Sequence, residues 1–285
     1  MGLIYRRNVS RSKVGNFIIL IIILLFAAFF MFPLVFMANN AFKPLEEILV
    51  FPPPLFVQRP TLNNFVGLSA FFRGGWVPLS RYVFNSVFIS FTATGGTLLL
   101  SSMAAYPLAK HKFLGKKTMN TLVIMSLLFS VQVLNIPRYI IYASVGMINT
   151  QWALILPAWQ LTLGLYLLKN FMGQINDSML EAARIDGCSE FRIYSKIVMP
   201  NVRPALLTLL VFSFMGTWNM DGGIFLFRED LRPFSAILAG LANGGIPRLG
   251  MTGAATLILM LPPTLLFLFS QNLIVETMST SGLKD

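Results

Sequence analysis

The feature that most constrains this chain is an unbroken apolar run, VGNFIILIIILLFAAFFMFPLVFM. It extends from Val14 to Met37, inside a charge-free window between Lys13 and Lys43. A helix needs about 20 apolar residues to cross the hydrocarbon core of a bilayer, and this run is long enough. It is too long for the apolar region of a secretory signal peptide, which has about 7–15 residues, and no clear cleavage site follows it. The sequence therefore predicts an uncleaved first membrane helix over about residues 16–38.

Further charge-free windows follow along the chain. The composition agrees with a membrane protein, because 55% of the residues are hydrophobic and 12% are charged, against about 25% charged in soluble domains. We therefore predict an all-α integral membrane protein with six transmembrane helices in one domain, residues 16–275, between tails at 1–15 and 276–285. The other five spans are expected near 82–106, between 117 and 138, near 151–168, between 203 and 221, and between 248 and 276.

Basic residues gather in alternate links between these windows. Because cytoplasmic links carry an excess of Lys and Arg, they are expected to share the cytoplasmic side, with both termini. The same rule explains the net charge of +11, so no nucleic-acid partner is expected. The basic positions are Arg6, Arg7, Arg11 and Lys13 in the N-terminal tail, Lys110, Lys112, Lys116 and Lys117 in the second link, and Lys169, Arg184, Arg192, Lys196 and Arg203 in the fourth.

One stretch contrasts with the apolar windows: SMLEAARIDGCSEFRIYSKIVMPNVRPA, from Ser178 to Ala205, hereafter the charged stretch. Each of its charged side chains would cost roughly 2.5–3.5 kcal/mol at the centre of a membrane helix, on the order of 20 kcal/mol together. The charged stretch is therefore expected to lie outside the membrane, in a link (residues 171–204) between the fourth and fifth spans.

The charged stretch has the residue pattern of two short helices. Ser178 with Glu181 three residues later is typical of a capping box, and the residues LEAARI favour a helix. Gly187 is expected to end this first helix, because glycine readily adopts the left-handed conformation. Ser189 is then expected to be the N-cap of the second helix.

The second helix is expected to be amphipathic. Phe191, Tyr194 and Val198 fall on one helical stripe. Pro200 and Pro204 are expected to close this helix before the fifth span. Together these features predict a helix–turn–helix platform on the cytoplasmic surface.

At this point the sequence resembles a known family. EAARIDG, with Tyr194, Ile197 and Pro200 at their offsets, resembles the EAA loop of permease subunits of binding-protein-dependent ABC importers. The surrounding segments SSMAAYPLAKHKFLGKK and GMINTQWALILPAW are similar to the carbohydrate-uptake class, and within it to the smaller permease of the maltose-transporter type. The resemblance covers nearly the whole chain.

The resemblance implies a function and partners. The chain is expected to pass a sugar or oligosaccharide by alternating access through the cytoplasmic membrane of a bacterium or archaeon. Implied partners are a second, homologous permease, two ATPase subunits and an extracytoplasmic solute-binding protein. ATP and Mg²⁺ would be used by the ATPase, with no cofactor bound here. The implied ATPase-docking residues are Glu181, Ala182, Ala183, Asp186, Gly187, Tyr194 and Pro200.

The substrate path is less defined by the sequence. Amides and indoles within the spans suit a sugar, which is bound by polar groups and by stacking on aromatic faces. The same side chains commonly join membrane helices through hydrogen bonds, and both interpretations stay open. The candidates are Asn85, Gln132, Asn135, Trp159, Gln160, Trp218 and Asn219.

A second open question concerns LANGGIPRLG, expected outside the cell between the last two spans. In maltose-type relatives the corresponding loop reaches into the binding protein and helps to expel the sugar. Asn243, Gly244 and Gly245 fit such a contact, because glycine allows close backbone approach. A plain flexible linker fits equally well.

Other functions are disfavoured. The segment FLGKKT is no phosphate-binding loop, because Lys110 stands where the first glycine is needed and Lys117 where Ser or Thr is needed. No set of catalytic side chains is recognised, so no enzyme activity is expected, and the lone His111 suggests no metal site. The alternative is an ion-coupled secondary transporter or another polytopic membrane protein. Such transporters place ionisable groups inside their spans, and these spans are almost free of them.

Overall fold

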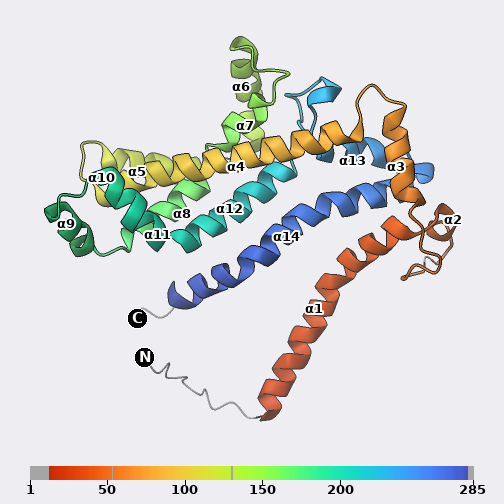
Figure 1. The fold of residues 1–285 in the computed structure, drawn as a ribbon, viewed down its shortest axis with the longest axis horizontal. Coiled ribbons are helices and arrows are strands. Elements are labelled where there is room, and N and C mark those ends of the chain that lie inside the picture. Colours follow the sequence, from red (N-terminus) through yellow and green to blue (C-terminus); the bar gives the residue numbers. More distant parts are fainter. Residues whose placement is uncertain (1–12, 53, 130, 282–285) are drawn as a thin grey trace. The chain divides into compact units, whose positions relative to one another are not determined.

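The computed structural model describes residues 13–52, 54–129 and 131–281. The expected tails, 1–15 and 276–285, lie partly outside these ranges, because residues 1–12 and 282–285 are not described. Within the described ranges the chain is helical and contains no strand, as the sequence predicted (Figure 1). The α-helices are α1 Lys13–Phe42, α2 Leu45–Ile48, α3 Asn63–Arg73, α4 Leu79–Lys110, α5 Lys116–Ser126, α6 Val131–Ser144, α7 Trp152–Ala158, α8 Thr162–Gly173, α9 Asp177–Ile185, α10 Glu190–Ile193, α11 Met199–Asn201, α12 Arg203–Trp218, α13 Phe234–Ala242 and α14 Leu249–Ser281.

Among the described residues, three helices are long and apolar enough to cross a membrane: Val14–Phe42, Leu79–Lys110 and Ile246–Gln271. A fourth candidate is a pair of segments, Glu190–Asn201 and Arg203–Trp218, bent by 78°. The windows expected to hold the third and fourth spans are each divided in two, into α5 and α6 and into α7 and α8. At the second division, Leu161 adopts an extended conformation (φ −68°, ψ 90°) just before α8.

The chain divides into two compact units. The first consists of Met1–Leu68 and Gly245–Leu257. In it, the side-chain amide of Asn64 donates hydrogen bonds to the carbonyl oxygens of Ala41 (2.9 Å) and Lys43 (2.7 Å). These bonds fix the chain where α1 ends. The apolar window of α1 is wholly unburied, which suits a surface that faces lipid.

The second unit consists of Ser69–Gly244 and Ile258–Asp285 and contains the charged stretch. Its centre is α4, against which α7, α8 and α12 pack (Figure 1). Close approach is possible where glycines face large side chains. A Cβ atom added to Gly96 would lie 2.0 Å from the indole nitrogen of Trp159, and one added to Gly164 would lie 2.4 Å from a methyl group of Leu209.

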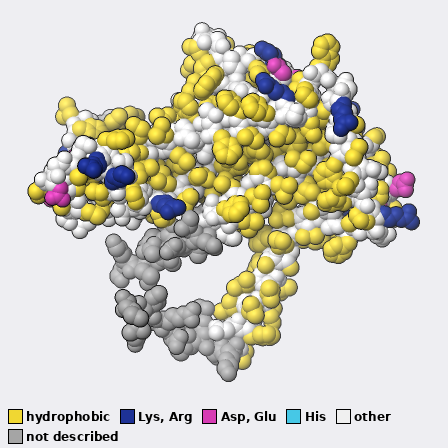
Figure 2. All heavy atoms as spheres, in the orientation of Figure 1, with side chains coloured by type: hydrophobic (Ala, Val, Ile, Leu, Met, Phe, Trp, Pro, Cys, Tyr) yellow, Lys and Arg dark blue, Asp and Glu magenta, His cyan; other side chains and the backbone are white. Residues whose placement is uncertain are grey.

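The exposed surface is largely apolar. In the face shown in Figure 2, hydrophobic side chains cover most of the surface and Lys and Arg occupy separate patches. In water, exposed apolar area on this scale would cause association. It is the surface that a bilayer requires.

Candidate functional site

The first helix of the charged stretch, α9, begins two residues earlier than the sequence predicted. Its N-cap is Asn176, whose side-chain oxygen accepts a hydrogen bond from the backbone N–H of Ser178 (3.1 Å). The expected cap at Ser178 is therefore wrong, because Asn176 is an equally strong cap and has the extended backbone (φ −66°, ψ 128°) that a cap requires. Glu181 consequently lies inside the helix rather than in its first turn.

The end of α9 follows the prediction. Gly187 has φ +77°, and its N–H donates to the carbonyl oxygen of Arg184 (3.0 Å). The N–H of Cys188 donates to the carbonyl oxygen of Ala183 (3.0 Å). These two bonds form a Schellman motif, which satisfies the last carbonyl groups of a helix. Ser189 then caps α10, where its hydroxyl oxygen accepts from the N–H of Arg192 (3.4 Å).

The second helix differs from the expected amphipathic stripe. After α10 the chain forms a wider π-helical turn, Tyr194–Val198, before α11. Val198 is fully buried and Tyr194 is half-buried, but Phe191 is 71% exposed, so the three side chains of the expected stripe do not share one buried face. Pro204 lies in the first turn of α12, where a missing N–H breaks no hydrogen bond.

The inner face of the charged stretch packs on the membrane helices. Leu180 of α9, Ile193 of α10 and Val198 are buried in one cluster with Leu168 of α8 and Leu209 of α12. Tyr194 adds a polar contact, because its hydroxyl group lies 2.7 Å from that of Ser102 in α4. The platform therefore has a fixed inner face.

Charged side chains join the stretch to the end of α4. Glu190 accepts hydrogen bonds from Nε of Arg184 (2.7 Å) and from the hydroxyl group of Tyr106 (2.7 Å), and lies 3.1 Å from Nε2 of His111. The hydrogen bond to Glu190 raises the pKa of Arg184 above its usual value. His111, the residue after α4, is therefore in direct contact with the charged stretch.

Lys110, the last residue of α4, forms a second junction. Its ammonium group donates to Asp177 (2.6 Å) and to the carbonyl oxygens of Gly173 (3.1 Å) and Ile175 (2.5 Å). The hydrogen bond from Lys110 lowers the pKa of the Asp177 carboxyl group. A polar cleft of about 470 Å³ lies between the two junctions, lined by Lys110, His111, Lys112, Asp177, Leu180, Glu181, Arg184 and Glu190.

The structure separates the expected docking residues into two groups. Glu181, Ala182, Asp186, Gly187 and Pro200 are exposed. Ala183 is buried and Tyr194 is half-buried, so these two contribute to the inner face.

Sequence reasoning missed two apolar side chains on the outer surface, Ile185 (87% exposed) and Phe191 (71% exposed). The signal was present in the sequence, because each is a large apolar residue inside a charged segment.

Among the candidates for the substrate path, two are held inside the fold. Asn85 is fully buried, its amide N–H groups donate to the carbonyl oxygens of Asp230 and Arg232 (both 2.9 Å), and its side-chain oxygen accepts from Gln151 (2.8 Å). The indole N–H of Trp218, also buried, donates to the carbonyl oxygen of Leu259 (2.8 Å). Their hydrogen-bonding groups are occupied within the chain, as helix-joining residues require.

The other candidates are more accessible. Gln132 and Gln160 are exposed, Asn135 is half-buried, and exposed Asn219 donates to the carbonyl oxygen of Met215 (2.8 Å). Trp159 is half-buried and its indole N–H donates to the carbonyl oxygen of Thr92 (3.2 Å).

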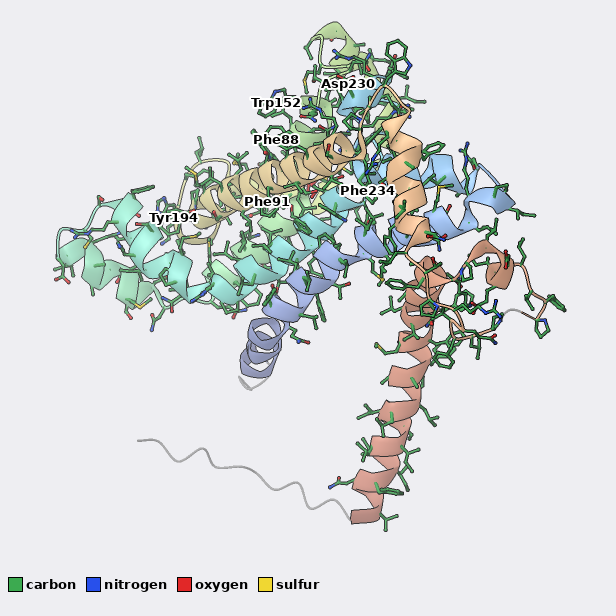
Figure 3. All side chains as sticks on the ribbon, turned by 45° about the vertical axis from the view of Figure 1, so that its right-hand side comes forward. Phe88, Phe91, Trp152, Tyr194, Asp230 and Phe234 are labelled. Atoms are coloured by element: carbon green, nitrogen blue, oxygen red, sulfur yellow. The ribbon has the colours of Figure 1, made fainter. Side chains whose placement is uncertain are left out.

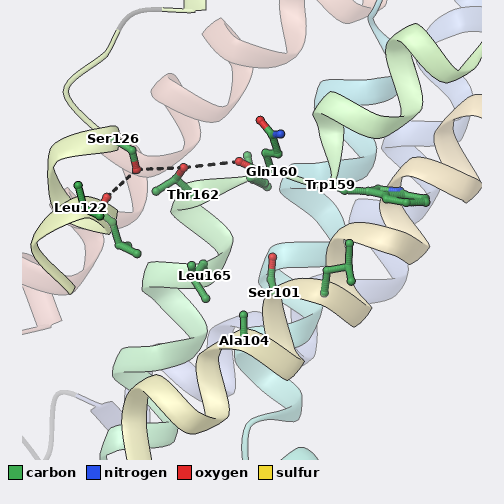
Figure 4. A pocket seen from close by; sticks show the side chains of 11 residues that line it. Ser101, Ala104, Leu122, Ser126, Trp159, Gln160, Thr162 and Leu165 are labelled. Atoms are coloured by element: carbon green, nitrogen blue, oxygen red, sulfur yellow. Dashed lines mark hydrogen bonds between the residues drawn. The ribbon is translucent and has the colours of Figure 1, made fainter. Parts of the chain in front are cut away.

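Trp159 and Gln160 meet at a pocket of about 430 Å³ beside the division between α7 and α8 (Figure 4). The hydroxyl groups of Ser101, Ser126 and Thr162 also belong to its lining. Ser126 donates to Thr162 (3.3 Å), and Thr162 lies 3.5 Å from the carbonyl oxygen of Gln160. These bonds are long, so a ligand hydroxyl group could replace them.

The expected contact loop follows α13. Asn243 is the C-cap of that helix and is exposed. Gly245 has φ +71° and open space around it, and Gly244 is half-buried. The described residues contain no group of three or more His, Cys, Asp or Glu side chains that could hold a metal ion.

Long apolar helices joined to a capped, charged helical platform are the features of a polytopic membrane protein. Residues 97–280 match the family described as the binding-protein-dependent transport system inner membrane component. The chain therefore belongs to this family, the permease components of ABC importers.

Two curated relatives are named as permease proteins of polysaccharide and oligosaccharide transport systems. The polygalacturonan/rhamnogalacturonan transport system permease protein YtcP of Bacillus subtilis is 30% identical over 77% of this chain and 74% of its own length. The arabinooligosaccharides transport system permease protein AraQ of Halalkalibacterium halodurans is 28% identical over 89% of this chain and 91% of its own length.

The fold is similar to that of a solved transporter. A chain of a bacterial ABC transporter involved in the import of the acidic polysaccharide alginate has a TM-score of 0.78 and 16% identity, over 92% of this chain and 98% of that one. A chain of the bacterial alginate ABC transporter in complex with a periplasmic protein bound to alginate pentasaccharide has a TM-score of 0.60 and 14% identity. At these identities the likeness concerns the fold.

Proposed function

We propose that this chain is one permease subunit of an ATP-driven importer that takes up a sugar or an oligosaccharide. The observation that carries the proposal is the family match over residues 97–280, together with relatives named for polygalacturonan and arabinooligosaccharide transport. Family membership decides against the ion-coupled transporter considered from the sequence.

An ATPase is proposed as a partner because the outer side chains of the charged stretch are exposed. A separate ATPase subunit docks on the outer surface of α9, formed by Glu181, Ala182, Ile185 and Asp186 and supported by their exposure. Small side chains allow a partner backbone to approach, and Ile185 supplies apolar area. ATP and Mg²⁺ are bound by that partner. A second, homologous permease and an extracytoplasmic binding protein complete the assembly.

The proposed topology keeps six spans with both termini in the cytoplasm. The third span is α5 with α6, the fourth is α7 with α8, and the fifth is α12. Non-helical backbone at membrane depth is tolerated where it lines a hydrated cavity or is covered by protein. The division at Trp159–Leu161 suits such a position, and Trp159 and Gln160, which line the pocket beside it, are the strongest remaining candidates for contact with the cargo.

The loop at Asn243–Gly245 is proposed to contact the binding protein. The support for this contact is that Asn243 is exposed and that the space around Gly245 is open. Deleting these three residues should impair sugar delivery while ATP hydrolysis persists. Uptake equal to that of the parent at all sugar concentrations would identify the loop as a linker.

The proposed function is tested by reconstitution. The complete transporter, with its second permease, ATPase and binding protein, is placed in proteoliposomes and offered neutral and acidic oligosaccharides separately. We expect ATP-dependent uptake of at least one class, lost when this chain is omitted. Absence of ATP-dependent uptake for every sugar offered would contradict the proposal.

A further inference from the structure

The end of α4 is joined to the segment that runs from α8 to α10 at two places that the family motif does not include. The first is Lys110. Its side chain is only 5% exposed, and its three donor hydrogens face three acceptors, the carbonyl oxygens of Gly173 and Ile175 and the carboxylate of Asp177. Gly173 is the last residue of α8, where unpaired carbonyl groups favour a cation. Lys110 therefore holds the link between α8 and α9.

The second place is Glu190, the first residue of α10. Its carboxylate accepts hydrogen bonds from Arg184 of α9 and from Tyr106 of α4. It also lies beside His111, the residue after α4. The carboxylate is 47% exposed, so each contact is weak alone. Tyr106 is buried, however, and fixes the geometry from the α4 side.

Between these two places lies α9, which has few buried side chains. It has nine residues, too few to be stable in water alone. Its only buried side chains are Leu180 and Ala183. The polar cleft borders α9. Leu180 and Ala183 belong to the apolar cluster that includes Ala105 and Tyr106 of α4, so the two junctions are the polar part of the attachment of α9 to α4.

We propose that Lys110 and Glu190 form a double clamp that makes α9 move together with α4, as positioning residues for the coupling of ATP hydrolysis to transport. This rests on the proposed function, in which the ATPase moves α9. With the clamp closed, displacement of α9 pulls on the end of a helix of 32 residues. With it open, α9 turns about its flanking links, Gln174–Asn176 and Asp186–Ser189, and the motion is not transmitted.

The test uses the complete reconstituted transporter carrying Lys110→Gln or Glu190→Gln. Sugar uptake and ATP hydrolysis are measured on the same proteoliposomes, and co-purification of the ATPase is scored. We expect the ATPase to remain bound and active while uptake per ATP hydrolysed falls by about tenfold, within the usual range of coupling between sites. Lys110→Arg should keep much of the parent's uptake per ATP hydrolysed, because arginine keeps the positive charge.

Two matched controls remove a charge nearby without touching the clamp. Lys117→Gln lies in the same basic link and Arg192→Gln in the same short helix, and both side chains are exposed. Neither should change the ratio. Equal ratios in parent, Lys110→Gln and Glu190→Gln would overturn the proposal. Loss of the ATPase from the complex would also overturn it, because these residues would then build the docking surface.

Hydrogen exchange of the purified chain separates the clamp from the proposed function. In both clamp variants the amides of α9 should exchange faster, while those in the middle of α4 keep their protection, which shows that the chain is folded. Unchanged protection of α9 would contradict the clamp even if no sugar were transported by the parent. Absence of uptake by the parent, with faster exchange in the variants, would contradict only the proposed cargo.

Discussion

The two ends of α4 are both held by polar contacts, but the contacts differ in kind. At the Asn85 end, the neutral and buried side chains of Asn85 and Ser86 bind backbone groups of residues 230–234, and the hydroxyl group of Tyr82 donates to Glu229 (2.8 Å). Asn85 binds two carbonyl oxygens there, and Ser86 accepts from the N–H of Phe234 (2.7 Å). At the Lys110 end, charged side chains take part in each junction. Lys110 binds Asp177 and two carbonyl oxygens, and the half-exposed Glu190 binds Arg184 and Tyr106. Figure 3 shows the two ends through Asp230 and Phe234 at one and Tyr194 at the other.

This difference separates a fixed joint from an adjustable one. A buried amide that loses its partner leaves unsatisfied groups in a water-free place, which costs about 1–3 kcal/mol for each group. A half-exposed ion pair exchanges its partner for water at little cost. The Asn85 end is therefore the fixed joint. The Lys110 end is adjustable only at the half-exposed Glu190 contacts, because the Lys110 side chain itself is 5% exposed.

The comparison depends first on which side of the membrane each end occupies. We expect cysteines at positions 75 and 244 to react with an impermeant thiol reagent on intact cells, in a background without Cys188, while a cysteine at position 184 does not react. The physical reason is the excess of Lys and Arg beside the Lys110 end. Permeabilised cells supply the control for position 184. The reverse labelling pattern would place the Lys110 end of α4 outside the cell and the Asn85 end in the cytoplasm.

The adjustable end should be the more sensitive one in function. Gly187→Val should nearly abolish uptake and weaken co-purification of the ATPase, because the backbone there has φ +77°, and a β-branched residue in that region costs about 1–3 kcal/mol.

Gly115→Val is the matched control for that change. Its backbone is equally left-handed (φ +88°), and both positions have open space, but it lies outside the charged stretch. Normal uptake in Gly187→Val, or an equal loss of uptake in both variants, would show that the turn after α9 has no special role in transport.

The fixed end should be the more sensitive one in stability. Asn85→Ala leaves two carbonyl groups and the amide of Gln151 without their partner, and should lower stability by about 3 kcal/mol. Unfolding in detergent, followed by circular dichroism, measures it. Asn219→Ala is the control, because that amide is exposed and its hydrogen bond, among the described residues, stays within its own helix. Similar unfolding of both variants would show that the Asn85 end is not a fixed joint.

A smaller effect is expected from acid at the Lys110 end. The pKa of Asp177 is held below its ordinary value of 3.8, first by the hydrogen bond from Lys110. The stability it contributes is therefore present above that value and is lost as the pH falls through the lowered pKa. Because the side chain is 74% exposed, the contribution is small.

The measurement compares the apparent melting temperature of parent and Asp177→Asn as the pH is lowered from about 6 to about 3. We expect the variant to lose less stability over this range than the parent. Glu46→Gln is the control, an exposed carboxylate in the other unit. A parallel decline in all three would show that the Asp177 contact contributes nothing.

Much of the local structure was readable from the residues. The long apolar windows predicted α1, α4 and α14, because no other structure satisfies the backbone in lipid. Gly187 and Ser189 marked a helix end and a helix start for reasons of backbone geometry and capping that act within a few residues. The all-helical class and the family resemblance followed from signals of the same local kind.

The errors arose where neighbours along the chain compete or where distant partners decide. Asn176 and Ser178 are both good caps, and only the backbone conformation selects between them. Phe191 fits a buried stripe by spacing, yet the π-helical turn that follows leaves it exposed.

The partners of polar residues could not be read from sequence. Asn85 in a span was compatible with a sugar site or with a helix contact, and its bonds to residues near 230 decide for the contact in this fold. Lys110 and His111 looked like ordinary basic link residues. Their roles depend on Gly173, Asp177 and Glu190, which lie 63 to 79 positions away. Periodicity and capping act over one or two helical turns, whereas a polar side chain binds whatever the packing of helices brings within about 3 Å.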